Sequence, residues 1–149
     1  MAALRVASER TIEAPAEKVY GVLADYRQHH PRILPPAFSD FVVERGGVGE
    51  GTIIAFKMTA GGRTRDFRVR VAELEPGRVL MESDTKSSLV TTFTVDSAAD
   101  GSRVRIETEW QGAGGFGGLM ERLFAPRVIE KIYVDELERL DQYARTAKL

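Results

Sequence analysis

The amino-acid sequence predicts an α+β protein in which an antiparallel sheet of about seven strands packs against a long C-terminal helix. Strand-like segments follow one another from residue 38 to residue 110. The connections between them are too short for parallel crossovers, so neighbouring strands run antiparallel. The last segment has apolar residues at near-helical spacing from Leu119 to Ala144. Since the strands alternate and this helix is amphipathic, the helix covers the apolar face of the sheet.

A first strand and a first helix precede this region. Residues 6–12 (VASERTI) form a candidate strand, and Pro15 suits the first position of the helix that follows. Pro31 disfavours helical angles at His30, so the helix ends there, and one or two short helices are expected after the first strand. The helix carries one apolar stripe, formed by Val19, Val22, Leu23 and Tyr26.

Six further strands are predicted, separated by turn residues such as Gly-Gly and Pro-Gly pairs. Alternation is clearest in the last of them, where Val104, Ile106 and Thr108 alternate with charged residues. One face of the sheet is therefore covered and the other is solvated. The six strands span residues 38–45, 51–58, 64–74, 78–83, 88–96 and 102–110.

Charged residues of the sheet are predicted to form its solvated outer face. The arginines of the hairpin at residues 63–70 belong to this face. Glu82 and Glu107 are placed outward, where they can pair with these arginines across strands. Met81 is assigned to the inner face.

The segment between the last strand and the C-terminal helix contains a Gly-x-Gly-x-x-Gly motif at Gly112, Gly114 and Gly117. A dinucleotide site needs this motif between a buried parallel strand and a crossover helix, with another strand to follow. Here the preceding strand alternates and no further strand is predicted. The motif therefore indicates a bendable connection, with Phe116 as its large side chain. Pro126 is expected to kink the C-terminal helix or to split it in two.

Length and composition indicate one soluble globular domain over residues 1–149. The chain has 43% hydrophobic and 29% charged residues, and no apolar run approaches the roughly 20 residues of a membrane span. The N-terminal residues lack the pattern of an export signal, so a cytoplasmic protein is expected. A net charge of −1 gives no field that attracts nucleic acid. Without cysteine, no disulfide, thiolate nucleophile or cysteine-bound metal is available.

The order of these elements resembles the START-like, helix-grip (SRPBCC) superfamily, and within it the polyketide cyclase/dehydrase family. The resemblance covers almost the whole chain and rests on TIEAPAEKVYGVLADY (11–26), GVGEGT (47–52), VAELEPGRVL (71–80) and DGSRVRIE (100–107). These are turns and packing positions, which specify a fold more than a chemistry. The resemblance implies that a curved sheet and the long helix enclose a hydrophobic cavity. Lipid-transfer domains and birch-pollen-allergen-like proteins belong to the same superfamily.

Candidate catalytic residues lie at the end of the first helix, which in the resembled fold is near the cavity mouth. His29 and His30 are the only histidines. An imidazole can take and return a proton near neutral pH, as ring closure of a polyketide requires, and Tyr26 is assigned to assist. Adjacent residues point in different directions, so at most one histidine faces a cavity. The alternative is that both lie at the surface, where the helix dipole favours them.

Candidate ligand-binding residues are those assigned to the inner faces. Methionines and single hydroxyls between aromatic rings suit an adaptable binding surface, with solid core packing as the alternative for each residue. The strand residues are Phe56, Met58, Phe67, Met81, Thr91, Phe93, Thr108 and Trp110, and the connection and helix add Phe116, Met120 and Phe124.

Three functions fit these features. The first is binding of a hydrophobic small molecule, such as a lipid, a polyketide or an isoprenoid-like compound. The second is a polyketide cyclase, aromatase or dehydrase in which His29 or His30, with Tyr26, moves protons. The third is a coenzyme Q or lipid chaperone, which YRQHHPRILPP (26–36) suggests by its similarity to coenzyme Q-binding relatives. A chaperone function of this kind predicts an exposed apolar rim around Ile33, Leu34, Phe116 and Leu119.

No cofactor and no metal site is expected, because two histidines without clustered carboxylates do not make one. The expected partner is a hydrophobic small-molecule ligand, with no nucleic acid and no transmembrane segment. The oligomeric state is left open and includes a homodimer.

Overall fold

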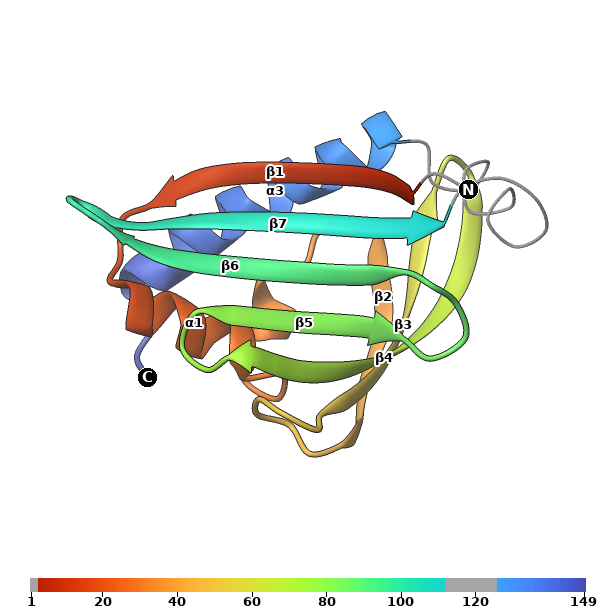
Figure 1. Cartoon of the computed structure of the whole chain (residues 1–149), viewed down its shortest axis with the longest axis horizontal. Helices are drawn as coiled ribbons and strands as arrows, with labels where there is room; N and C mark the ends of the chain where they lie inside the picture. The colour runs from red at the N-terminus through yellow and green to blue at the C-terminus, as the bar shows by residue number, and fades with distance from the viewer. Residues whose placement is uncertain (1–2, 112–125) are drawn as a thin grey trace.

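The computed structural model describes residues 3–111 and 126–149, whose strands form one curved antiparallel sheet (Figure 1). The order across the sheet is β1-β7-β6-β5-β4-β3-β2, so consecutive strands from β2 to β7 are neighbours and β1 pairs with β7. The predicted antiparallel sheet is confirmed. Its strands are β1 (Ala3–Ile12), β2 (Phe38–Arg45), β3 (Ile53–Ala60), β4 (Arg63–Glu75), β5 (Val79–Asp84), β6 (Val90–Ala98) and β7 (Gly101–Gln111).

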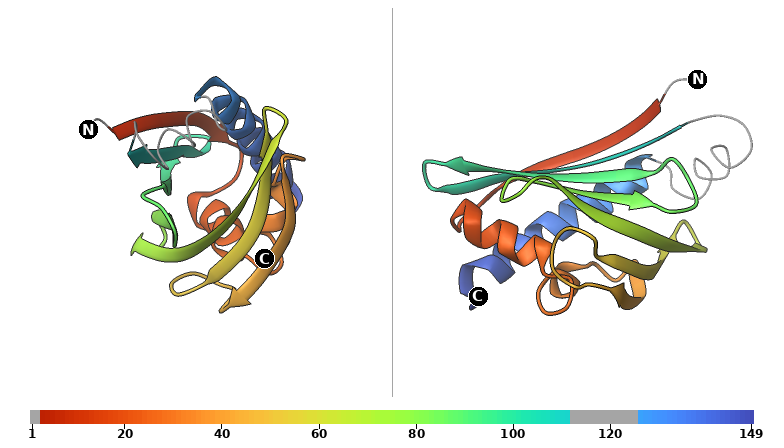
Figure 2. Two further views of the ribbon diagram at one scale, coloured as in Figure 1. Left: turned by 90° about the vertical axis from the view of Figure 1, so that its right-hand side faces the viewer. Right: turned by 60° about the horizontal axis from the view of Figure 1, so that its bottom comes forward.

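The helices lie on the concave side of the sheet, which curves around them (Figure 2). They are α1 (Ala16–Ala24), the 3-10 helix η1 (His30–Ile33) and α3 (Pro126–Thr146). The helix α3 is amphipathic, and its apolar face packs against β1 and η1. Its buried apolar side chains are Ile129, Tyr133, Leu137, Leu140 and Ala144.

A tight turn ends α1 at Ala24, earlier than the end at His30 that was predicted from Pro31. The carboxylate of Asp25 accepts hydrogen bonds from the backbone N–H groups of Arg27 (3.0 Å) and Gln28 (2.9 Å). The backbone N–H of His30 donates to the Asp25 carbonyl at 2.8 Å. An aspartate that closes a turn on its own backbone in this way competes with helix propagation. The turn brings Tyr26 and His30 to the concave, inner face of the sheet.

The facing of β5 is opposite to the prediction. Leu80 is fully buried and pairs with Phe93 of β6, so the inner residues of β5 are Leu80, Glu82 and Asp84. Side chains alternate along a strand, and Met81 therefore faces outward, opposite Ala72 and Thr92. The assignments of Met81 to the inner face and of Glu82 to the outer face were both wrong.

Arg65 is a second exception to the predicted outer face. Its guanidinium lies 3.2 Å from the buried carboxylate of Asp84 and 4.3 Å from the centre of the Phe67 ring. The other arginines of this hairpin are exposed as expected. Glu107 pairs with Arg105 of its own strand at 2.6 Å, and not with the hairpin.

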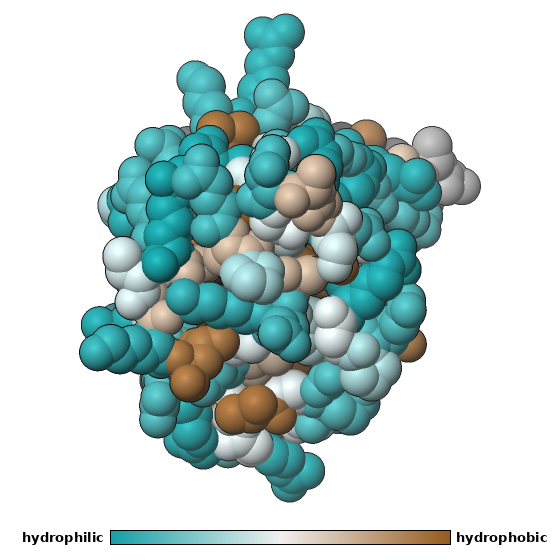
Figure 3. All heavy atoms as spheres, turned by 90° about the vertical axis from the view of Figure 1, so that its left-hand side faces the viewer, coloured by the Kyte–Doolittle hydropathy of each residue, from teal (hydrophilic) through white to brown (hydrophobic). Residues whose placement is uncertain are grey.

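The face of the molecule shown in Figure 3 is mostly hydrophilic, with small hydrophobic areas between the hydrophilic side chains. No helix within residues 3–111 and 126–149 has the length and apolarity needed to cross a membrane. The large hydrophobic side chains that are exposed are Val42, Val48, Leu74, Val134 and Leu149.

A buried carboxylate joins the end of β1 to α3. Asp141 accepts hydrogen bonds from the backbone N–H of Glu13 at 2.9 Å and from the guanidinium groups of Arg10 at 3.2 Å and Arg145 at 2.9 Å. Its side chain is 3% exposed. The hydrogen bonds from Arg145, followed by those from Glu13 and Arg10, lower the pKa of Asp141 from 3.8 to about 2.

We predict that Asp141→Asn lowers the free energy of unfolding at neutral pH by roughly 2 kcal/mol, the value of such a pKa shift. Because folding lowers the pKa, this stabilisation is present above about pH 4 and is lost as the pH falls toward about 2. Urea unfolding of the wild type and the variant across this range measures the difference.

The matched control is Asp135→Asn, since Asp135 also accepts from an arginine four residues later, at 2.9 Å, but is 42% exposed. Its loss should stay near the roughly 0.3 to 0.5 kcal/mol of exposed helical pairs. Equal losses in the two variants would contradict the role given to Asp141.

Candidate functional site

A cavity lies between the inner face of the sheet and the helices α3 and η1. The space free of atoms in it is about 720 Å³, with the open solvent at its mouth included. Its wall is mainly apolar and consists of His30, Leu34, Phe38, Phe41, Ile54, Phe56, Met58, Phe67, Val69, Glu82, Leu89, Thr91, Phe93, Ile106, Thr108, Trp110, Ile129, Tyr133 and Glu136.

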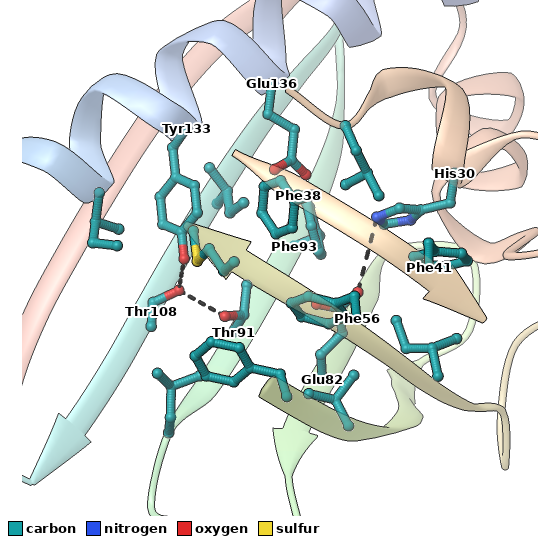
Figure 4. A pocket seen from close by; sticks show the side chains of 18 of the residues that line it. His30, Phe38, Phe41, Phe56, Glu82, Thr91, Phe93, Thr108, Tyr133 and Glu136 are labelled. Carbon is teal, nitrogen blue, oxygen red and sulfur yellow. Dashed lines mark hydrogen bonds and ion pairs between the residues drawn. The ribbon is translucent and has the colours of Figure 1, made fainter. Parts of the chain in front are cut away.

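Two polar side chains, His30 and Glu82, lie on one side of this cavity (Figure 4), and Tyr26 contacts both of them from behind the wall. The hydroxyl of Tyr26 donates to Oε2 of Glu82 at 2.6 Å, and Nε2 of His30 lies 3.9 Å from the same oxygen. The rings of Tyr26 and His30 stack with centroids 4.5 Å apart, and Phe93 meets the His30 ring edge-on at 5.6 Å. These contacts fix the direction of both rings.

The hydrogen bonds of His30 determine which ring nitrogen carries the proton. Nδ1 lies 2.6 Å from the carbonyl oxygen of Leu23, which only accepts, so Nδ1 is the protonated nitrogen. In the neutral ring, Nε2 then has a free lone pair near Glu82. Burial lowers the pKa of His30 from 6.5, against the opposing effect of Glu82. His30 is thus a neutral base at neutral pH.

Tyr26 is held as a neutral phenol. Its side chain is fully buried, and burial, together with the charge of Glu82 and the hydrogen bond to it, raises the pKa of Tyr26 well above 10. A phenol that donates to a carboxylate forms a charge-assisted hydrogen bond, worth about 1.5 to 3 kcal/mol.

A chain of three hydroxyls crosses the cavity from the helix to the sheet (Figure 4). The hydroxyl of Tyr133 is hydrogen-bonded to Thr108, whose Oγ1 lies 2.6 Å from Oγ1 of Thr91. Burial raises the pKa of Tyr133, so this hydroxyl stays protonated. Each of these hydroxyls can both donate and accept, so the chain places polar groups beside the space that a ligand would occupy.

Glu136 faces the cavity from α3, one turn beyond Tyr133 (Figure 4). The residue is 2% exposed, and within the described part of the chain no hydrogen bond or ion pair reaches its carboxyl. Burial, then the negative charges of Glu82 and Asp135, raise the pKa of Glu136 well above 4.5.

This arrangement combines an apolar enclosure with a base, neutral hydroxyls and a buried carboxyl. Such groups can orient a ligand oxygen or transfer a proton to and from it. Over the ranges that the structure describes, no three His, Asp or Glu side chains gather as metal ligands do.

The two histidines occupy different places. His30 lines the cavity, whereas Nδ1 of His29 lies 2.7 Å from the Tyr143 hydroxyl, outside the cavity wall. The expectation that at most one histidine faces the cavity agrees with this placement. Tyr26 lies behind the wall and reaches the site through Glu82.

Most strand residues assigned to ligand binding line the cavity. They are Phe56, Met58, Phe67, Thr91, Phe93, Thr108 and Trp110. Met81 does not, because it faces the other side of the sheet. Phe116, Met120, Phe124 and the glycine motif lie outside the described residues. Ile33 is fully buried, so the apolar rim predicted there was wrong, while Leu34 lines the cavity.

Sequence reasoning missed both carboxyl groups. Met81 and Glu82 are adjacent and face opposite sides of β5, and the more hydrophobic of the two was assigned to the inner face. Glu82 was therefore assigned to the outer face. Glu136 did carry a usable signal, since it lies three and seven residues after Tyr133 and Ile129, on their face of the helix. An acidic residue within an apolar helical stripe is a local inconsistency of the kind that marks functional positions.

Comparison with known proteins agrees with this architecture. The polyketide cyclase/dehydrase and lipid transport family matches residues 3–145. The NMR solution structure of KanY protein (ms6282) is 33% identical, with a TM-score of 0.87, covering 98% of this chain and 100% of that one. A comparison with curated proteins finds no match.

Two more distant structures share the fold alone. The Zhui aromatase/cyclase from Streptomyces sp. R1128 is 18% identical, with a TM-score of 0.74, covering 97% of this chain and 94% of that one. Ginseng major latex-like protein 151 from Panax ginseng is 13% identical, with a TM-score of 0.74, covering 97% and 99% of the two chains. The helix-grip architecture and the family match over residues 3–145 lead to one conclusion: this chain belongs to the polyketide cyclase/dehydrase and lipid transport family.

Proposed function

We propose that the chain binds a largely apolar small molecule, of lipid, polyketide or isoprenoid type, in the cavity between the sheet and α3. The observation that carries this proposal is the cavity wall, which is apolar and aromatic apart from a few convergent polar groups. Ligand sites have this composition, because apolar contact supplies affinity and a few hydrogen bonds fix orientation. The family match over residues 3–145 supports the same class of ligand.

A ligand in the cavity would also contribute to the stability of the fold. Unfilled apolar space costs about 24 cal/mol per Å³ in core truncations, so a guest that fills it stabilises the fold.

We predict that acetylnaphthalene, a flat neutral probe, raises the Tm and changes the fluorescence of Trp110, the single tryptophan, which lines the cavity. At a hundredfold excess over Kd the stabilisation should be about 2.7 kcal/mol. Differential scanning calorimetry and a fluorescence titration measure the two effects.

The matched variants are Val69→Phe and Arg70→Phe, neighbours on β4. Val69 faces the cavity and Arg70 is exposed on the other face. Val69→Phe should weaken binding by about tenfold or more, about 1.4 kcal/mol, whereas Arg70→Phe should leave Kd unchanged. If both variants bind as the wild type does, the ligand is not in this cavity.

A second candidate function is proton-transfer catalysis of the cyclase type, and the group of Tyr26, His30 and Glu82 favours it. Nε2 of His30 offers a lone pair at the cavity wall, and the neighbouring Glu82 carboxylate would stabilise the imidazolium formed when the base takes a proton. Tyr26 would hold Glu82 in place. The expected reaction is enolisation and ring closure of a poly-β-ketone, which begins with removal of a proton next to a carbonyl.

We predict that His30→Gln lowers the turnover of a poly-β-ketone by on the order of 10² to 10⁴, while His29→Gln leaves it unchanged. Because burial lowers the pKa of His30, kcat/KM should stay constant through neutral pH and decline only below about pH 6.5. Binding of acetylnaphthalene to each variant shows whether the cavity is intact. Full turnover in His30→Gln would exclude this base and leave the binding function standing.

A further inference from the structure

We propose that Glu136 donates a hydrogen bond from its carboxylic acid to an uncharged carbonyl or hydroxyl oxygen of the ligand, so that the cavity selects neutral oxygenated molecules over carboxylates. This inference rests on the proposed binding function and specifies the class of ligand. It starts from a buried polar group that the protein itself leaves without a partner.

The surroundings of Glu136 favour its neutral form. No lysine or arginine is among the described residues that line the cavity. The charged groups that act on it are the carboxylates of Glu82 and Asp135, which have the same sign as an ionised Glu136. The other titratable groups are the neutral Tyr26, His30 and Tyr133. An unpaired buried charge is costly, and a carboxyl group in this position keeps its proton.

A protonated carboxyl has one O–H donor, and within the described residues nothing accepts from it. The side chain points toward the space between Tyr133 and His30 (Figure 4). A ligand oxygen in that space would satisfy this donor. Tyr133 is three residues earlier on the same helix face and lines the same cavity.

Charge decides between classes of ligand. A carboxylate in this cavity would meet Glu82 and Glu136 with no cation among the described wall residues, and it would be desolvated without compensation. An ammonium ligand would instead favour the ionised form of Glu136. A ketone or phenol requires no charge to be buried and accepts the hydrogen bond that the protein leaves unused.

The test uses four naphthalene derivatives that differ at one substituent: acetylnaphthalene, isopropylnaphthalene, naphthoate and naphthylmethylamine. Isothermal titration calorimetry on the full chain compares the wild type with Glu136→Leu and Glu136→Gln. Acetylnaphthalene should bind the wild type more tightly than naphthoate or the amine. Glu136→Leu should weaken the binding of acetylnaphthalene by about 2- to 10-fold, which is the value of one hydrogen bond. The affinity for isopropylnaphthalene should stay unchanged. Glu136→Gln keeps a donor and should stay within about twofold of the wild type.

Two further readouts do not depend on comparing affinities. The affinity of the wild type for acetylnaphthalene should fall as rising pH removes the proton of Glu136, while Glu136→Gln should show no such dependence. Difference infrared spectroscopy of the wild type against Glu136→Gln should show the C=O band of a protonated carboxyl at neutral pH, displaced when acetylnaphthalene binds.

Tighter binding of naphthoate or of the amine, no loss in Glu136→Leu, or a carboxylate band in place of the acid band would overturn the inference while the binding function stands. If none of the four compounds binds, the binding function fails as well. Glu136→Leu replaces an unpaired buried acid by an apolar side chain, so its Tm should not fall.

Discussion

The hydrogen bond between Tyr26 and Glu82 joins the first helical region to the centre of the sheet, and the site depends on it. It gives the partly buried carboxylate of Glu82 a donor at 2.6 Å, which offsets part of the cost of placing that group among apolar side chains. The same tyrosine ring stacks on His30 and fixes the imidazole beside Glu82. One contact therefore positions a base, an acceptor and part of the cavity wall together.

Two acidic side chains face a cavity whose wall is otherwise mainly apolar. Glu82 enters from β5 and Glu136 from α3, so two elements distant in the sequence bring two carboxyl groups toward one space. The phenol of Tyr26 donates to the carboxylate of Glu82, whereas Glu136 has no counter-charge among the described residues, and burial raises its pKa so that it stays protonated. Buried groups with such shifted protonation are typical of sites that bind or transform ligands.

The sequence was sufficient for the fold and insufficient for the centre of the site. Close turns and alternation in residues 102–110 determined the antiparallel order, and the C-terminal periodicity determined what covers the sheet. In β5, however, Met81 and Glu82 are adjacent, and hydrophobicity alone chose the wrong one for the inner face. The facing depends on the pairing of Leu80 with Phe93, and on a tyrosine donor more than 50 residues away in the chain. Such long-range compensation is not encoded in local periodicity.

The placement of β1 at the edge of the sheet has a consequence for biosynthesis. Leu4 pairs with Trp110, so the first strand leaves the ribosome long before its partner exists. Until β7 is made, β1 has no partner strand, and until α3 follows, the apolar side chains on the inner face of the meander remain open to other chains. Contacts of such large sequence separation also slow folding. The nascent chain therefore passes through a period in which it is prone to aggregate, and chaperones that hold exposed apolar strands would act during that period.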